Sequence, residues 1–203
     1  MTGVTQLILA SASPSRRRML EQAGLAFDTI PSGVDEDEAK RSLVAARATA
    51  GDIARHLAEL KARAVSTRHP GALVIGADST LSCEGRLFDK PVDRQAAKEQ
   101  LRALAGRTHE LCSAAVAAQD GVRLWHHSDA ARLTMRNLSA DFLDIYLARA
   151  GDSVLGSVGA YQLEKLGVHL FARIEGDYFT ILGLPLLPLL SFLELHGIGL
   201  VPR

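Results

Sequence analysis

Short apolar runs alternate with amphipathic segments along the whole chain, and no internal repeat or low-complexity linker interrupts them. Apolar and β-branched runs predict strands over Gln6–Ala10, Phe27–Pro31, Ala72–Ala77, Thr80–Cys83, Leu87–Phe88, His109–Ala118, Val122–His127, Ala131–Leu138, Val168–Ile174 and Tyr178–Leu182. Apolar residues at helical spacing predict helices over Pro14–Ala23, Ile53–Thr67, Arg94–Leu104, Ala140–Ala150 and Leu186–Leu195. This mixture is typical of an α/β or α+β domain with a large mixed sheet.

Residues that favour helix ends and tight turns support this division. Asp52, Asp93 and Ser139 stand where three of the predicted helices begin, and glycines stand where helices end. Three residue pairs are typical of hairpin turns: Glu84-Gly85, Asp120-Gly121 and Glu175-Gly176.

Composition narrows the class of protein. The chain has 203 residues, of which 47% are apolar, and this predicts a single domain over residues 1–203 whose two lobes share a core. Lys and Arg together number 23, as do Asp and Glu, so the formal net charge is zero. A dedicated nucleic-acid-binding protein usually carries a basic excess, and we therefore expect no nucleic-acid partner.

The cysteines and the N-terminal sequence favour a cytoplasmic location. Cys83 and Cys112 lack metal-ligand spacing and are more typical of small core residues than of a disulfide. The first apolar run has no charged region before it and is too short for a signal peptide or a membrane span. We therefore expect a cytoplasmic protein without a membrane partner.

The candidate chemistry begins between the first predicted strand and the first predicted helix. Ser13 suits an N-cap and Pro14 suits the first helical position. A helix N-terminus offers unpaired N–H groups and the positive end of a dipole, and the hydroxyls and the arginines at 16–18 would add to a phosphate site there. A capped surface helix with solvated arginines explains the same residues equally well.

Asp78 and two lysines are further candidates. Asp78 follows a strongly apolar run, and ligands of open α/β sheets bind beyond the carboxyl ends of strands. The alternative for Asp78 is an Asx-turn or a cap. Lys61 borders an apolar helical stripe, where it would extend to solvent or meet a phosphate, and Pro91 holds Lys90 extended.

Two other segments have more than one interpretation. The four consecutive acids at 35–38 are usually a solvated loop, but one of them would help to hold a divalent metal beside Asp78. The glycine-rich stretch from Gly156 to Gly167 either lets the backbone approach a ligand or turns tightly. The histidines show no metal spacing, and no nucleophile elbow, P-loop or dinucleotide fingerprint occurs.

Taken in order, seven segments of the chain resemble the Maf family of nucleotide pyrophosphatases. They are LILASASPSRRRMLEQAG, VDEDE, LKARA, VIGADS, KPVDRQAA followed by LRALAGRTHE, GAYQLEKLG, and IEGDYFTILGLPLLPLL. Each segment alone is modest, but their ordered combination from Leu7 to Leu190 is specific.

The resemblance implies a hydrolase that uses a divalent metal, Mg²⁺ or Mn²⁺, to cleave nucleoside triphosphates to monophosphate and pyrophosphate. Such an enzyme would remove non-standard or modified nucleotides. The implied fold is an elongated, strongly twisted mixed sheet flanked by helices, with two lobes and a central cleft. The resemblance is compatible with a homodimer.

The resemblance also assigns residues. It places at the phosphates Ser11, Ser13, Arg16, Lys61 and Lys90, with Arg17 assisting. It makes Asp78 the catalytic base, and it makes Glu36 and Asp78 the carboxylates beside the metal. Arg18, further along the helix, is expected to point elsewhere.

Three positions are associated with substrate choice in the family: Ser15, Ser79 and Glu164. The branch that acts on dTTP and UTP typically carries Arg, Thr and Gln there, and the branch that acts on 7-methyl-GTP carries Glu at the last position. Glu164 matches the second branch, whereas the two serines match neither. An ionised carboxylate accepts hydrogen bonds, which favours a guanine-type or modified purine base.

Two other functions remain as alternatives. A nucleotide-binding regulator of cell division would need no Asp at position 78, so the complete set of charged positions favours the enzyme. A nucleic-acid-binding protein would use the arginines at 16–18, but no aromatic platform stands near them.

Overall fold

The computed structural model describes residues 6–200, in which seven strands form one mixed sheet of order β2-β1-β3-β5-β6-β7, with β4 beside β3. The strands are β1 (Leu7–Ala10), β2 (Asp28–Thr29), β3 (Leu73–Cys83), β4 (Arg86–Phe88), β5 (Thr108–Gln119), β6 (Val122–Met135) and β7 (Phe171–Glu175). β1 runs parallel to β2 and β3, and every other pairing is antiparallel. The prediction of a mixed sheet with flanking helices is confirmed.

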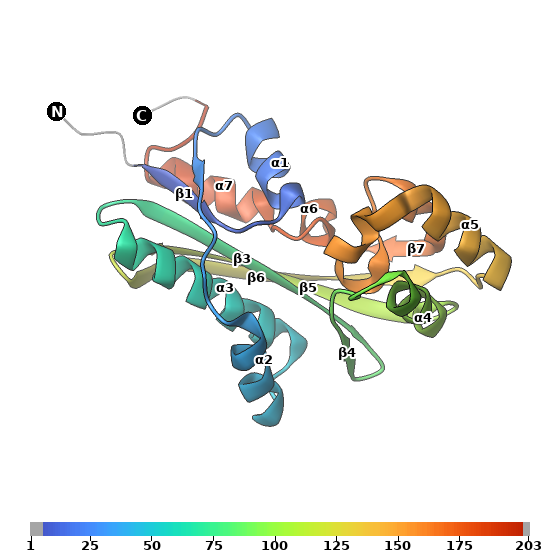
Figure 1. Ribbon diagram of the computed structural model, residues 1–203. Coiled ribbons are helices and arrows are strands. Elements are labelled where there is room, and N and C mark those ends of the chain that lie inside the picture. The colour runs from blue at the N-terminus through green and yellow to red at the C-terminus, as the bar shows by residue number, and fades with distance from the viewer. Residues whose placement is uncertain (1–5, 201–203) are drawn as a thin grey trace.

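The helices cover both faces of the sheet. They are α1 (Pro14–Gln22), α2 (Glu36–Ala45), α3 (Ala50–Arg68), α4 (Arg94–Leu104), α5 (Ala140–Ala150), α6 (Tyr178–Ile181) and α7 (Leu186–Leu195), with 3₁₀ helices at Gly151–Gly156, Val158–Ala160 and Leu166–Leu170. α4, α5 and α7 have the predicted bounds. Figure 1 shows α3 along one side of β3 and β5, α1 and α7 on the other side near β1, and α4 and α5 at the far end. None of the helices within residues 6–200 is long and apolar enough to cross a membrane.

The central strand, β3, has two different partners along one of its edges. Residues 73–76 pair with β1, and residues 81–83 pair with β4. Along the opposite edge β3 pairs with β5 without a break over residues 74–82. The backbone of residues 77–80 therefore has no strand partner on one edge, and this leaves a gap in the sheet.

Two hydrophobic clusters meet at this gap. The cluster at the β1 end includes Leu7, Leu9, Met19, Leu20, Ile75, Ala77, Leu189 and Phe192. The cluster at the far end includes Leu81, Phe88, Leu101, Leu104, Leu133, Leu143 and Tyr146. The first cluster contains β3 side chains as far as Ala77, and the second contains β3 side chains from Leu81 onward. Residues 78–80 therefore lie at the boundary between two separately packed regions.

The close approach of α3 to β3 depends on a glycine. A Cβ atom on Gly76 would lie 2.2 Å from the carbonyl oxygen of Ala58 and 2.6 Å from the backbone nitrogen of Ala62. On the same face, α3 packs against β5 through small residues: Ala54, Ala58, Ala62, Ala114, Val116 and Ala118. This packing brings the α3 backbone, and Lys61 on it, unusually close to the sheet.

Two pairs of predicted strands are each a single strand. β3 is continuous, so Asp78 lies in the middle of a strand, where its backbone pairs with Ala114, and not at a strand end as predicted. β6 likewise continues through Ser128 and Asp129, which pair with Ala114 and Ser113. In both cases continuous backbone pairing with β5 keeps the polar residues Asp78, Ser128 and Asp129 within the sheet.

The acidic run is the start of a helix and not a solvated loop. The side chain of Asp35 caps α2 by accepting a hydrogen bond from the backbone N–H of Glu38 at 2.9 Å. The acids at 36–38 lie in the first turn, where the helix dipole favours negative charge. α3 also begins earlier than predicted, because Thr49 and not Asp52 is its N-cap.

The predicted last strand, over residues 178–182, is wrong. Residues 178–181 form α6 and Leu182 is its C-cap, because the side chain of Asp177 accepts a hydrogen bond from the backbone N–H of Thr180 at 2.8 Å and caps a helix there. The pair Glu175-Gly176 therefore precedes a helix and forms no hairpin.

We predict that Gly76→Ala lowers the free energy of unfolding by about 1–3 kcal/mol, because the added methyl group must push α3 away from β3. Gly51→Ala is the matched control, since nothing lies within 4 Å of the Cβ position of Gly51, which is within α3. Urea unfolding of both variants checks this. Equal stability of the two variants would show that α3 has room to move.

Candidate active site

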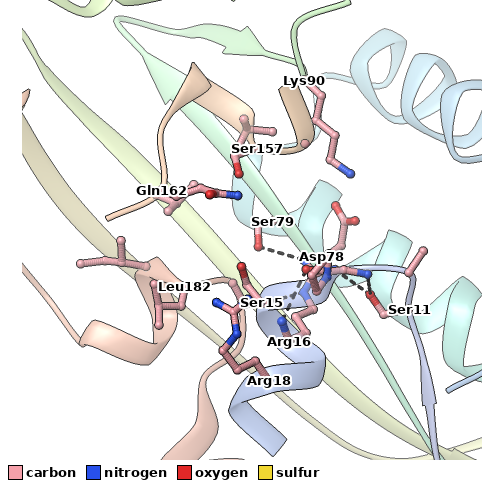
Figure 2. Close-up of a pocket in the computed structure, with 18 of the residues that line it drawn as sticks. Ser11, Ser15, Arg16, Arg18, Asp78, Ser79, Lys90, Ser157, Gln162 and Leu182 are labelled. Atoms are coloured by element: carbon pink, nitrogen blue, oxygen red, sulfur yellow. Dashed lines mark hydrogen bonds between the residues drawn. The ribbon is translucent and has the colours of Figure 1, made fainter. Parts of the chain in front are cut away.

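A cavity of about 570 Å³ opens beside the gap in β3. Its lining comes from the β1–α1 connection, the start of α2, the middle of α3 and β3, the segment after β4, the 3₁₀ region after α5 and the segment after α6. Figure 2 shows side chains from these distant segments converging on the cavity. The gap in the sheet is therefore lined by polar side chains, although hydrophobic clusters pack on either side of it.

The start of α1 opens into this cavity. Ser13 is the N-cap, as predicted, and its Oγ accepts a hydrogen bond from the backbone N–H of Arg16 at 3.5 Å. Ser11 Oγ accepts a hydrogen bond from the backbone N–H of Ser13 at 3.2 Å. Both serines line the cavity, so the positive end of the α1 dipole faces any anion bound there.

The buried guanidinium of Arg16 connects three segments of the chain. Nε donates to the carbonyl oxygen of Gly183 at 2.8 Å. Nη1 donates to the carbonyl oxygen of Ala77 at 2.9 Å and to Ser11 Oγ at 3.3 Å. Nη2 donates to Ser79 Oγ at 3.0 Å. Arg16 thereby supplies the hydrogen-bond donor that a neighbouring strand would otherwise give to the carbonyl of Ala77. Most of its donors are used by the protein itself.

Ser79 belongs to a directed chain of hydroxyl groups. Ser113 Oγ donates to the carbonyl oxygen of Thr180 at 2.8 Å. The hydroxyls of Ser79 and Ser113 are 2.9 Å apart, and because the hydrogen of Ser113 is already used, Ser79 is the donor in this pair. Ser79 accepts in turn from Arg16, so its hydroxyl takes part in joining α1 to α6 and its only hydrogen is used within the protein.

Lys61 pairs with two carboxylates in the cavity wall and is not directed to solvent. Its Nζ lies 2.6 Å from Asp78 Oδ1 and 2.7 Å from Glu36 Oε2. Asp78 reaches α3 because successive residues of a strand face opposite sides, and Ser79 accordingly faces α1. Burial lowers the pKa of Arg16, while the charges of Asp78 and Glu36 act to raise it. The two carboxylates thus stabilise two buried cations.

The carboxylates of Glu36 and Asp78 suit a divalent cation that is shared with a ligand. Both reach the same ammonium nitrogen, so they converge on one small volume. Mg²⁺ is commonly held by one or two carboxylates together with phosphate and water oxygens. Within the described part of the chain, no group of three or more His, Cys, Asp or Glu side chains is placed to hold a metal. The residues therefore fit a cation bound together with phosphate oxygens.

The cavity carries an excess of positive charge. Its lining has five cations, Arg16, Arg18, Lys61, Lys90 and Lys165, but only the carboxylates of Glu36, Asp78 and Glu164. Figure 2 shows the ammonium group of Lys90 directed into the cavity on the side of Asp78. A cleft with an excess of one charge concentrates ligands of the opposite charge, so this cavity favours a polyanion.

The 3₁₀ region after α5 forms the opposite wall. Gly159 has a φ of +77°, a conformation that favours glycine, and a Cβ there would lie 2.6 Å from Leu81 Cδ1, so this segment packs closely against β3. The hydroxyl of Tyr161 and Nε2 of His109 form a hydrogen bond of 2.9 Å. Burial lowers the pKa of His109 to about 4, so the ring that supports this wall is neutral at physiological pH.

Ser15 and Glu164 join the two walls directly. Ser15 Oγ donates to Glu164 Oε1 at 3.3 Å, although 149 residues separate them in sequence. Arg18 follows Ser15 by three residues on α1 and also lines the cavity, as does Leu182 after α6. The end of the cavity away from Lys61 is thus built from residues of both walls.

Comparison with known proteins assigns the family. Residues 6–196 match the family described as Maf-like protein. The chain belongs to the Maf family. A protein of Paramagnetospirillum magneticum named nucleoside triphosphate pyrophosphatase is 58% identical over 195 residues, which cover 96% of this chain and 100% of that protein. A Brucella abortus protein named 7-methyl-GTP pyrophosphatase is 50% identical over 189 residues, which cover 93% of this chain and 95% of that protein.

The resemblance found in the sequence is therefore confirmed. Among solved structures, the HAM1 protein from Coxiella burnetii matches 64% of this chain and 73% of its own chain, with 18% identity and a TM-score of 0.41. A likeness of this size supports no argument about function.

The structure of this Maf chain brings together all but one of the predicted site residues. The predicted residues that line the cavity are Ser11, Ser13, Ser15, Arg16, Glu36, Lys61, Asp78, Ser79, Lys90 and Glu164. Their roles in binding and catalysis stay predictions. Arg17 is the exception, because its exposed side chain pairs with Glu21 at 2.7 Å, outside the cavity lining.

The three arginines of α1 have three different environments. Arg16 is buried, Arg17 lies on the surface and Arg18 lines the cavity. The expectation that Arg18 points elsewhere is wrong, because three-residue spacing places it on the same helix face as Ser15. Because Arg16 is buried, the three arginines do not form one shared basic surface.

The sequence reasoning missed the residues that support the site from behind. Ser113 pairs with Ser79 across β3 and β5, and Thr180 and Gly183 supply the carbonyl groups that receive the hydrogen bonds of Ser113 and Arg16. Ser113 had a recognisable signal, because it is a polar residue within the otherwise apolar run from Leu111 to Ala118. The other two contribute backbone groups, which a sequence does not reveal.

We predict that Arg16→Lys lowers the free energy of unfolding by about 2–4 kcal/mol, because lysine keeps the charge but cannot make the four hydrogen bonds of the guanidinium. Arg17→Lys, in the same helix, keeps its exposed ion pair and should leave stability unchanged. Chemical denaturation of the two variants decides the point. If both unfold like the unmodified protein, Arg16 does not hold the segments together.

Proposed function

We propose that this protein hydrolyses nucleoside triphosphates between the α- and β-phosphates and releases nucleoside monophosphate and pyrophosphate. The observation that carries the proposal is the convergence of Lys61, Glu36 and Asp78 with the open N-terminus of α1 in one cationic cavity. The named activity of relatives that match nearly the whole chain supports it. We also propose that the enzyme removes non-standard or modified nucleotides.

The triphosphate lies at the end of the cavity that Ser11, Ser13, Lys61 and Lys90 line. The hydroxyls of the two serines donate to phosphate oxygens, the positive end of the α1 dipole faces the phosphates, and the two lysines balance the negative charge. Arg16 acts mainly by holding these groups in place, because the protein itself uses most of its donors. Positioning and charge neutralisation are the main requirements of phosphoryl transfer.

Asp78 accepts the proton of the attacking water. Lys61 holds Oδ1 at 2.6 Å and so fixes the plane of the carboxylate, while Oδ2 forms no hydrogen bond within residues 6–200. The water oxygen forms a bond to the α-phosphorus, the bond from that phosphorus to the bridging oxygen breaks, and pyrophosphate leaves. Water, carboxylate and phosphorus must be aligned, which the short Lys61 contact favours.

Glu36 and Asp78 would hold Mg²⁺ or Mn²⁺ together with the phosphates. A divalent ion supplies positive charge that stabilises the leaving pyrophosphate. Lys61 pairs with both carboxylates at 2.7 Å and 2.6 Å and so holds them close together for this task.

The base lies at the opposite end of the cavity, near Ser15 and Glu164. The carboxylate of Glu164 accepts hydrogen bonds from the N1–H and N2 amino groups of a guanine-type base, and it suits uracil or thymine less well. Ser79, whose hydroxyl is engaged by Arg16 and Ser113, positions the wall and does not read the base. One domain of two lobes around this cleft, a cytoplasmic location and a homodimer stay predictions.

We predict that Asp78→Asn lowers turnover by about 10²-fold or more while the fold survives, because the amide keeps the shape but neither accepts the proton nor holds a cation. Asp144→Asn, which changes an exposed carboxylate on α5, is the control. Pyrophosphate release and circular dichroism measure the two effects. Normal turnover in a folded Asp78 variant, or release of orthophosphate and diphosphate by the unmodified enzyme, would contradict the proposal.

We predict that Mn²⁺ binds at least about tenfold more tightly in the presence of an α,β-methylene nucleotide than in its absence, because phosphate oxygens complete the ligand set. Glu36→Gln should remove most of this gain, whereas Glu38→Gln, in the same helical turn, should not. The electron paramagnetic resonance signal of free Mn²⁺ reports binding without turnover. Tight nucleotide-independent binding would mean that the protein alone forms the metal site.

A further inference from the structure

The helix α2 carries Glu36 into the cavity, yet little holds this helix in place. No residue of α2 is buried, and Figure 1 shows the helix beside the start of α3, on the side away from the sheet. Within residues 6–200, the side chains of α2 form two ion pairs with the rest of the protein. Glu36 pairs with Lys61 inside the site. Lys40 pairs with Asp89, and this second pair holds α2 from outside the site.

The ion pair of Lys40 with Asp89 joins two elements that line the cavity. Lys40 follows Glu36 by four residues, so both lie on the same face of α2. Asp89 directly precedes Lys90, whose ammonium group is directed into the cavity (Figure 2). Neither Lys40 nor Asp89 is among the residues that line the cavity. The pair is therefore next to two residues of the site without being part of its lining.

The segment that carries Asp89 is firmly anchored. Phe88 is part of the hydrophobic cluster at the far end of the sheet, and Pro91 is buried. The carbonyl oxygen of Asp89 accepts a hydrogen bond from Nε2 of Gln100, on α4, at 2.8 Å. A helix without buried residues is thus tied to a fixed point. Because the side chain of Asp89 is 73% exposed, water partly screens the ion pair, and its effect should be modest.

We infer that Lys40 is a positioning residue, which together with Asp89 holds the first turn of α2 so that Glu36 stays where the cation and the phosphates bind. The inference rests on the proposed function, because the shared cation is part of it. Without the ion pair, α2 leaves its place more often, and Glu36 leaves the cation site with it. A helix of this length is marginal in water on its own, so a detached α2 also loses its helical hydrogen bonds.

The test exchanges the charges of the pair. Lys40→Glu and Asp89→Lys should each weaken the binding of Mn²⁺ in the presence of an α,β-methylene nucleotide by about three- to fivefold, the scale of one partly exposed ion pair. The double variant restores the pair with its charges exchanged and should bind within about twofold of the unmodified protein. Hydrogen exchange of the α2 amides should be faster in both single variants and recover in the double variant, while exchange in α5 stays unchanged.

Lys98→Glu is the matched control. Lys98 pairs with Asp144, and its side chain is 18% exposed, as is that of Lys40, but neither Lys98 nor Asp144 lines the cavity. This variant should leave Mn²⁺ binding and hydrogen exchange in α2 as they are. If the two residues act only through their charge on the cavity, the single variants should shift Mn²⁺ binding in opposite directions, because one adds negative and the other positive charge.

The outcomes separate this inference from the proposed function. Opposite shifts, no recovery in the double variant, or an equal effect of Lys98→Glu would overturn the role of Lys40. Absence of both pyrophosphate release and nucleotide-dependent Mn²⁺ binding in the unmodified protein would overturn the proposed function instead. In that case hydrogen exchange of α2 in the same variants still tests whether the ion pair holds the helix, because it requires neither metal nor turnover.

Discussion

The site depends on the buried guanidinium of Arg16. The gap in β3 leaves the carbonyl of Ala77 without a strand partner, and an unpaired buried carbonyl is costly. Arg16 satisfies this group and, in the same plane, binds Ser11, Ser79 and Gly183. One side chain thus lets the sheet remain open where the cavity lies, and it fixes the three segments that border the opening.

A second constraint acts from the opposite face of the sheet. Gly76 and the alanines of α3 let the helix backbone approach β3 so closely that Lys61 reaches Asp78 two residues further along the strand. Alternation along β3 then sends Asp78 toward α3 and Ser79 toward α1. Asp78 and Ser79 are neighbours in sequence, yet each is held by a different layer of the fold.

Local signals explain why much of this could be predicted from the sequence. α4, α5 and α7 have strong apolar patterns, and α1 has a capping serine followed by proline, so their ends follow from short-range chemistry. β3 could not be delimited, because its continuity through Asp78 is decided by pairing with β5. α2 had a signal that was misread: Asp35 and Glu38 have the spacing of a cap, but charge density favours a loop.

Site residues could be predicted from the sequence where the chemistry of the side chain itself marks them. They could not be predicted where the direction of the side chain or a backbone group determines whether a residue belongs to the site. Arg16, Arg17 and Arg18 are identical in chemistry, and only the 100° step of a helix separates a buried connector, a surface ion pair and a cavity cation. The same geometry divides the cavity. Arg16 and Lys61 hold the end that we propose for the phosphates, whereas Ser15 and Glu164 join the two walls at the end that we propose for the base. Because neither Ser15 nor Glu164 shares a hydrogen bond with Asp78 within residues 6–200, the residues that we propose to read the base are held separately from the carboxylate that we propose to accept the proton.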